Sequence, residues 1–131
     1  MKEKSTLYRL LGDENTSHKL VSACRHLVEE FPIVHIATWQ GGSWLGLDDA
    51  ALLISCAEAG LVLVAFDRAT LPWHAGQVLR AGGNHGGLML FRRTVRSTDY
   101  GAQARLLTGF WTDEGRKWER LNRIAYLPKT P

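Results

Sequence analysis

Short runs of consecutive apolar residues alternate along this chain with segments whose apolar residues recur at helical spacing. The clearest run is LVLVAF, residues 61–66, which is followed directly by Asp67. A strand that is apolar at every position is typical of a parallel sheet with helices on both faces, because neither face of the strand meets water. Such strands separated by helices predict an α/β fold. The expected strands are residues 7–13, 33–39, 61–66, 87–91 and 123–127.

The segments between these strands carry the signals of helices. In residues 15–31 the apolar positions recur at helical spacing, Thr16 or Ser17 precedes them as a capping residue, and Pro32 follows. Further helices are expected at residues 48–60, from about 73 to 81 and at 98–118, with a glycine-rich loop at 40–47.

The length of 131 residues fits one domain over residues 1–131. We expect a three-layer α/β/α domain with a mostly parallel sheet of about five strands. Cys24 and Cys56 lie in apolar-periodic stretches, where cysteine usually serves as a small core residue. Two scattered cysteines also indicate a reducing compartment. The N-terminus does not resemble a signal peptide and no apolar run reaches the ~20 residues of a membrane span, so we expect a cytoplasmic protein without membrane association.

The net charge of +3 is unevenly distributed along the chain. Residues 1–65 hold 5 Lys and Arg against 8 Asp and Glu, whereas residues 66–131 hold 11 against 5. A planar guanidinium suits phosphate groups, so the basic half favours a polyanionic partner, although a solvated basic surface explains it equally well. The arginines concerned are Arg68, Arg80, Arg92, Arg93, Arg96, Arg105, Arg116, Arg120 and Arg123.

Acidic residues stand where the chain should reach one edge of the sheet. Asp13 ends the first expected strand, Asp67 follows the third, and Asp48 and Asp49 begin the helix after the second. The carboxyl ends of parallel strands meet at one edge, where ligands of open α/β sheets bind. Clustered carboxylates repel one another, and a hard divalent cation with oxygen ligands relieves that repulsion. Asp13, Asp49 and Asp67 are therefore the candidate ligands of a Mg²⁺ or Mn²⁺ ion.

These motifs together resemble the PIN-like family of small bacterial proteins, relatives of PIN-domain ribonucleases and of the toxins in toxin–antitoxin pairs. The resemblance is carried by LLGDEN, GLDDAALL, VLVAFDRATLPWHA and RIAYLP in that order. It implies a Mg²⁺- or Mn²⁺-dependent endoribonuclease that acts as a toxin and binds an antitoxin protein. The resemblance also implies that Asp13, Asp49 and Asp67 hold the metal and serve catalysis. Asp48 then falls on the helix-capping position.

The chain departs from the PIN pattern after the third acid. PIN domains usually carry a fourth acid close to it, whereas Arg68, Ala69 and Thr70 stand there in this sequence. Glu14 and Asp99 are the alternatives for the fourth acid, and the sequence does not choose between them.

Further residues near this edge are candidates for a supporting or substrate-binding role. Arg68 either contacts a substrate phosphate or pairs with Asp67, and His74 makes a structural hydrogen bond or a substrate contact. Tryptophans in loops after strands offer surfaces for base stacking, although they serve equally well as hydrophobic pegs. Tryptophans 111 and 118 belong to the core or to a face for an antitoxin or a homodimer. The supporting set is Glu14, Asn15, Arg68, Thr70, His74, Trp44 and Trp73.

Two other functions fit parts of the same pattern. The first is a catalytically incomplete PIN-like module that binds RNA or a protein without cutting. The second, a phosphoacceptor receiver-like domain, has paired acids after strand one, as in Asp13 and Glu14, and an aspartate after strand three. It also needs a lysine at the end of strand five, which YLPK matches only loosely, and it gives Asp49 no role.

Overall fold

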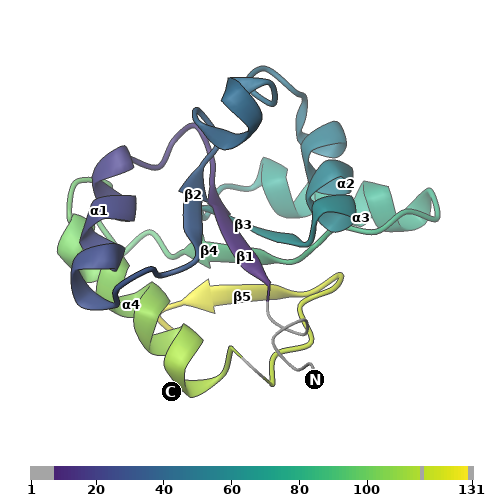
Figure 1. The fold of residues 1–131 in the computed structure, drawn as a ribbon. Helices are drawn as coiled ribbons and strands as arrows, with labels where there is room; N and C mark the ends of the chain where they lie inside the picture. The colour runs from purple at the N-terminus through teal and green to yellow at the C-terminus, as the bar shows by residue number, and fades with distance from the viewer. Residues whose placement is uncertain (1–7, 116, 130–131) are drawn as a thin grey trace, which may run out of the picture.

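The computed structural model describes residues 8–115 and 117–129. Its centre is one sheet of five strands, all parallel, in the order β2-β1-β3-β4-β5 (Figure 1). This is the order of flavodoxin-like sheets. The strands are β1 (Arg9–Gly12), β2 (Ile33–His35), β3 (Leu61–Phe66), β4 (Leu88–Phe91) and β5 (Ile124–Leu127).

Helices cover both faces of this sheet, which confirms the expected three-layer α/β/α architecture. The helices α1 and α4 pack against each other on one face, and α2 and α3 pack together on the opposite face (Figure 1). A short 3₁₀ segment, η2 (Trp39–Gly42), lies in the connection between β2 and α2. The helix bounds are α1 (His18–Leu27), α2 (Asp49–Ala59), α3 (Thr70–Arg80) and α4 (Tyr100–Asp113).

The apolar strand β3 lies at the middle of the sheet and separates two hydrophobic clusters. Val62 and Val64 contribute to the cluster under α1 and α4, whereas Leu61, Leu63 and Ala65 contribute to the cluster under α2 and α3. All five side chains are buried, because both faces of the strand are covered. This explains why β3 shows no alternation of apolar and polar residues.

The last connection of the sheet has the opposite hand from the other three. The chain moves in the same direction from β3 to β4 and from β4 to β5, yet α3 and α4 lie on opposite faces. Right-handed crossovers account for about 98% of such connections, so this one is a rare exception. Ile124 and Tyr126 of β5 lie on the face of the sheet that α2 and α3 cover, and both side chains are partly exposed.

Several element bounds differ from those expected. The strand predicted over 33–39 ends at His35, where the side-chain Nδ1 accepts a hydrogen bond from the backbone of Ala37 and begins a turn. The helix expected from about residue 73 begins at Thr70, because Pro72 is tolerated in a first helical turn. The helices expected at 15–31 and 98–118 are shorter and cover residues 18–27 and 100–113.

Cys24 and Cys56 are free thiols buried in the two clusters, as expected, and burial raises the pKa of each to about 12. Among the described residues, no helix has the length and apolar character needed to cross a membrane.

Candidate active site

The candidate site lies at the carboxyl edge of the sheet, where β1 and β3 are neighbours. In this strand order the connections from these two strands leave toward opposite faces, and such a switch point is where open α/β sheets bind ligands. Asp13 follows β1, and Asp67 and Arg68 follow β3. The expectation that separate strands bring these residues to one edge is therefore confirmed.

The chain after β1 folds back to hold the Asp13 carboxylate. The Asp13 Oδ1 atom accepts hydrogen bonds from the backbone N–H groups of Asn15 (3.0 Å) and Thr16 (3.2 Å). The Thr16 hydroxyl donates to the Asp13 carbonyl at 2.8 Å. A Cβ atom on Gly12 would lie 2.6 Å from the Thr16 Oγ1, so this turn requires glycine at position 12. We call residues 12–16 the Asp13 turn.

The pKa of Asp13 is raised to about 6 by its burial. The two backbone N–H groups and the Arg68 guanidinium favour the charged form, but they only partly offset the cost of removing the carboxylate from water. The negative charge of the Asp13 carboxylate is therefore only partly compensated by its neighbours.

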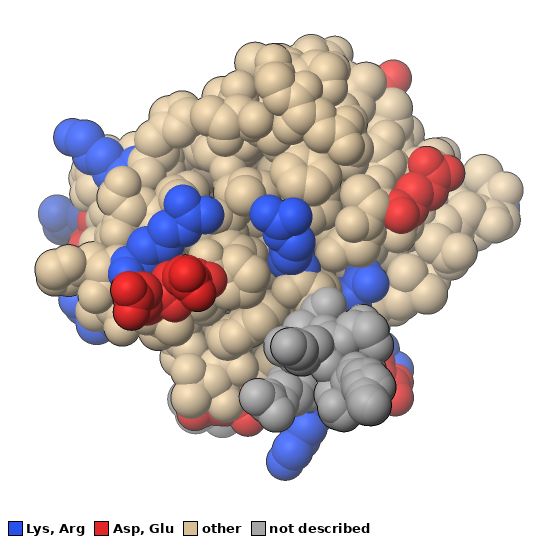
Figure 2. Space-filling model, viewed as in Figure 1, with Lys and Arg blue, Asp and Glu red and all other residues tan. Residues whose placement is uncertain are grey.

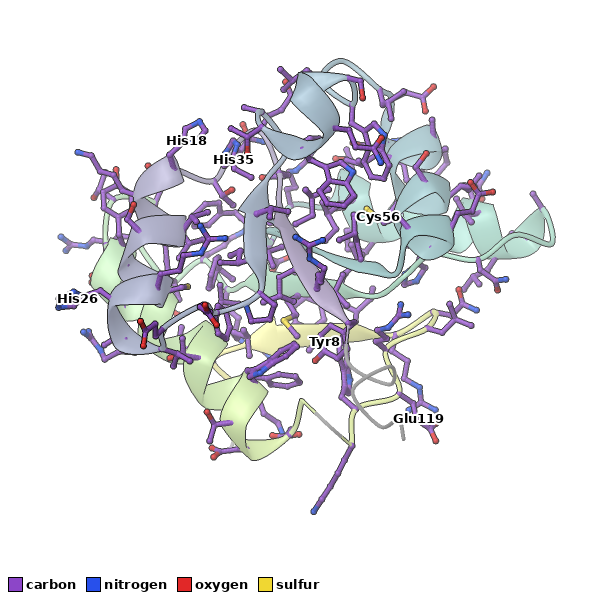
Figure 3. All side chains as sticks on the ribbon, viewed as in Figure 1. Tyr8, His18, His26, His35, Cys56 and Glu119 are labelled. Carbon is purple, nitrogen blue, oxygen red and sulfur yellow. The ribbon has the colours of Figure 1, made fainter. Side chains whose placement is uncertain are left out.

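His35 supports the Asp13 turn from β2. Its Nδ1 accepts from the Ala37 backbone, and its Nε2 lies 2.7 Å from the Thr16 carbonyl oxygen, which assigns a neutral ring with the proton on Nε2. The His18 ring stacks on it, with 4.0 Å between ring centroids (Figure 3). The role of His35 as a positioning residue is not among those predicted from the sequence. Its place at the end of a strand, like that of Asp13, was the available signal.

The start of α2 brings Asp49 to the same place. Asp48 is the N-cap, as expected, because its Oδ1 accepts a hydrogen bond from the Ala51 backbone at 2.8 Å. Asp49 is the first helical residue, and its half-buried side chain is directed at the residues after β3.

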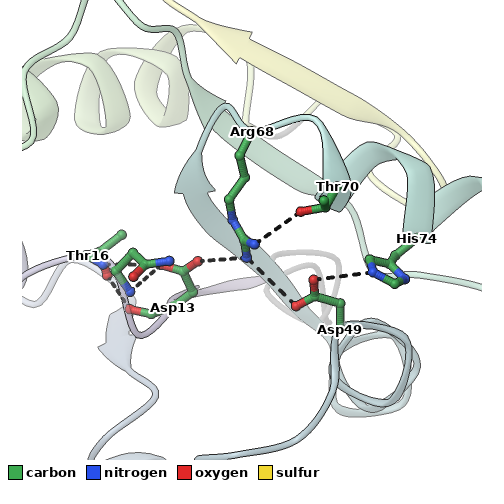
Figure 4. A network of polar contacts seen from close by, with 7 residues as sticks. Asp13, Thr16, Asp49, Arg68, Thr70 and His74 are labelled. Atoms are coloured by element: carbon green, nitrogen blue, oxygen red, sulfur yellow. Dashed lines mark hydrogen bonds and ion pairs between the residues drawn. The ribbon is translucent and has the colours of Figure 1, made fainter.

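Arg68 links these carboxylates into one network (Figure 4). Its Nη2 atom lies 3.8 Å from the Asp13 Oδ2 and 3.7 Å from the Asp49 Oδ1. The other Asp49 oxygen, Oδ2, lies 3.7 Å from the His74 Nε2. The Arg68 Nη1 donates to the Thr70 hydroxyl at 3.4 Å. One guanidinium nitrogen therefore faces two carboxylates from distant parts of the chain.

The third expected metal ligand is not part of this network. Asp67 is half-buried after β3, and the ion pairs of Arg68 run to Asp13 and Asp49 rather than to its neighbour Asp67. The alternative in which Arg68 pairs with Asp67 is therefore wrong. Within residues 8–115 and 117–129, no three histidine, cysteine, aspartate or glutamate side chains gather as a potential metal-holding group.

The two candidates for a fourth acid lie outside the network as well. Glu14 is exposed, and Asp99 caps α4 by accepting a hydrogen bond from the Ala102 backbone at 3.1 Å. Asn15 takes part through its backbone N–H alone, and Ser17, one of the two expected caps, is the cap of α1.

The tryptophans differ in their access to the site. Trp73 lies in the first turns of α3 rather than in a loop, is 58% exposed, and contacts the His74 ring edge-on with 5.0 Å between centroids. Trp44 packs edge-on against Trp39 on the cluster under α2 and α3. Trp73 thus retains a free surface beside the network, whereas Trp44 is partly buried as a hydrophobic peg.

The second histidine near the glycine-rich stretch has a structural role. His85 is buried, its Nδ1 accepts from the Gly87 backbone at 3.1 Å, and burial lowers its pKa.

Some arginines of the basic half are bound within the fold, some are exposed at the carboxyl edge, and others are exposed elsewhere on the molecule. Arg92 donates to the Pro128 carbonyl at 2.7 Å, and Arg120 donates to the Gly86 carbonyl at 2.9 Å. Arg93 and Arg96 follow β4 and are exposed. Figure 2 shows one face of the molecule, on which basic and acidic side chains stand in small groups without one continuous basic patch. Because β4 is the neighbour of β3, Arg93 and Arg96 follow a strand at the same edge of the sheet as the residues after β3.

Lys129 after β5 pairs with Glu114 of α4. A receiver-like site would direct Lys129 toward Asp67, whereas here Lys129 is engaged by Glu114.

Comparisons with protein-family models, with curated proteins and with solved structures each found no match for this chain.

Proposed function

We propose that this protein is a Mg²⁺- or Mn²⁺-dependent endoribonuclease whose active centre is the network around Asp13, Asp49 and Arg68. The observation that carries the proposal is the meeting of Asp13 and Asp49, from different elements, on one guanidinium nitrogen at the switch point of the sheet. Two carboxylates that share one cation in this way are a donor set suited to a hard metal ion.

The residues present fit such an ion. Mg²⁺ needs only one or two protein carboxylates, since waters and substrate phosphates complete its coordination. Asp13 and Asp49 supply the carboxylates, and Asp67, which follows the strand beside β1, is the third candidate. When bound, the metal supplies an activated water and stabilises charge on the leaving oxygen of a phosphodiester.

Other residues of the chain then bind the RNA substrate. Exposed Arg93 and Arg96 attract the RNA backbone, and exposed Trp73 offers a face on which a base stacks. His74, beside Asp49, is in reach of the same region. The PIN-like resemblance adds that the protein is a toxin held by an antitoxin protein. The two scattered cysteines add a cytoplasmic location, and a homodimer is a second assembly for the same chain.

The test is cleavage of a labelled structured RNA with Mn²⁺ and with EDTA. Asp13→Asn, Asp49→Asn and Asp67→Asn should each reduce the rate by roughly 10²- to 10³-fold, as is typical when one charge-stabilising group leaves an active site. Asp113→Asn, an exposed carboxylate at the far end of α4, is the control and should cleave normally. Cleavage that persists in EDTA or in Asp13→Asn would contradict the proposal.

A binding module that does not cut RNA is the second candidate, and one observation favours it. The Arg68 guanidinium already offsets part of the negative charge of Asp13 and Asp49. In that case RNA affinity should survive Asp13→Asn, and the binding constant should fall steeply with salt concentration.

A further inference from the structure

Arg68 stands where the chain departs from the PIN pattern, and its contacts point to a role of its own. We infer that Arg68 is an internal counter-ion: it offsets part of the negative charge of Asp13 and Asp49 until a divalent cation displaces it, and it then binds the phosphate of the substrate. This inference rests on the proposed metal site and adds a device that couples metal binding to RNA binding.

The contacts of Arg68 with the two carboxylates are electrostatic and loose. Charge-assisted N–H···O hydrogen bonds measure about 2.7–2.9 Å, whereas the two Nη2–oxygen distances are 3.8 and 3.7 Å. The Arg68 Nε is buried without a hydrogen-bond partner in the described part of the chain. Arg68 therefore offsets negative charge of Asp13 and Asp49 without forming the short hydrogen bonds that would fix its side chain there.

The position of Arg68 leaves its side chain free to move. The residue lies between the end of β3 at Phe66 and the start of α3 at Thr70, so it belongs to neither element. Its side chain is 38% exposed. A rotation about the side-chain torsions carries the guanidinium into solvent without breaking a backbone hydrogen bond of the sheet or the helix.

Charge explains why a metal ion and Arg68 exclude each other. Two carboxylates and one guanidinium leave a single net negative charge in the network, and a divalent ion at the same carboxylates meets the guanidinium as a like charge. Once displaced, the planar guanidinium presents paired donors to phosphate. Because coupling between ligands is reciprocal, RNA that draws Arg68 away should tighten metal binding, and metal should tighten RNA binding.

The first experiment measures Mn²⁺ binding by calorimetry and by electron paramagnetic resonance of the free ion, with no RNA present. Arg68→Gln should bind Mn²⁺ roughly tenfold more tightly, as expected when one positive charge is removed a few ångströms from a divalent ion in a solvent-accessible site. Arg68→Lys keeps the charge and should stay close to wild type. Arg80→Gln makes the same charge change at the exposed far end of α3 and is the matched control. Equal Mn²⁺ affinity in wild type and Arg68→Gln would overturn the inference.

The second experiment measures binding of a labelled RNA in EDTA and in a non-cleaving divalent ion. Arg68→Gln should weaken RNA binding in the divalent ion by about tenfold, the opposite sign from its effect on Mn²⁺, because the phosphate loses its guanidinium. In wild type, the Arg68 side-chain ¹⁵Nε–H resonance should shift during a Mg²⁺ titration and saturate with metal binding. An unmoved resonance in a protein that binds Mg²⁺ contradicts the displacement, whether or not the variants fold.

These outcomes separate the inference from the proposed nuclease. Tighter Mn²⁺ binding by Arg68→Gln that is lost in the double variant with Asp13→Asn supports the counter-ion even if wild type cleaves no RNA. Cleavage by wild type together with unchanged Mn²⁺ affinity in Arg68→Gln supports the nuclease and rejects the counter-ion.

Discussion

Asp13 and Asp67 occupy equivalent places in the fold and yet have different environments. Each follows a buried strand at the same edge of one sheet, and each backbone N–H donates to the neighbouring strand, to the Val64 carbonyl at 3.1 Å and to the Phe91 carbonyl at 2.7 Å. The Asp13 side chain is buried and accepts two backbone hydrogen bonds. Asp67 is half-buried.

The difference comes from the residues that follow each aspartate. After Asp13 the chain turns back on itself and encloses the carboxylate with the N–H groups of Asn15 and Thr16. After Asp67 the chain enters α3 within a few residues, and Ala69 at the N-cap position provides no side-chain acceptor. The first carboxylate is thus fixed by its own loop, whereas the segment after β3 carries the loosely held Arg68.

The largest expected effect is a pH dependence that arises from the burial of Asp13. Its pKa in the folded protein is raised from 3.8 to about 6, so the folded state retains a proton that the unfolded state has lost. Stability should therefore fall as the pH rises from about 4 to about 6, by about 3 kcal/mol from this group.

This pH effect is measured as the difference in free energy of unfolding between wild type and Asp13→Asn, in urea at several pH values. The other carboxyl groups titrate in both proteins and cancel in the difference. A difference that stays constant from pH 4 to pH 7 would show that the Asp13 carboxylate is not held in a desolvated environment.

Replacement of His35 should have the next largest effect, because it removes the support of the Asp13 turn. In His35→Phe the buried Thr16 carbonyl loses its donor and the Ala37 N–H loses its acceptor, at a cost of about 2 kcal/mol. His18→Phe keeps an aromatic ring on the exposed partner and should cost less than about 0.5 kcal/mol. Denaturant unfolding of both variants measures the contrast, and equal losses would remove His35 from the support of the turn.

The smallest expected effect compares two threonines that follow the two aspartates. Thr16→Val removes the buried hydroxyl that donates to the Asp13 carbonyl and should cost about 1 kcal/mol. Thr70→Val removes an exposed hydroxyl that contacts Arg68 at 3.4 Å and should cost less than about 0.5 kcal/mol. Thermal unfolding measures the stability of the two variants, and a larger loss of stability in Thr70→Val than in Thr16→Val would contradict this prediction.

The strands and helices were largely predictable because burial and helix capping leave their mark on short stretches of sequence. The strand LVLVAF is apolar throughout because both of its faces are covered, and Asp48 begins a helix because its carboxylate caps the N–H of Ala51. The hand of the last connection was not predictable in this way. It depends on which face of the sheet α4 covers, and that choice is made by packing against α1 rather than by the sequence of α4 alone.

The sequence by itself determined that carboxylates from β1, β3 and the start of α2 meet at one edge, since strand alternation dictates that meeting. Only the tertiary structure decided which of them interact. A pair with its neighbour Asp67 is one of the two roles that the sequence predicts for Arg68, yet its guanidinium faces Asp13 and Asp49 instead. The physical reason is the direction of side chains in space: residues adjacent in the chain after a strand point apart, and elements distant in the chain supply the nearer charges.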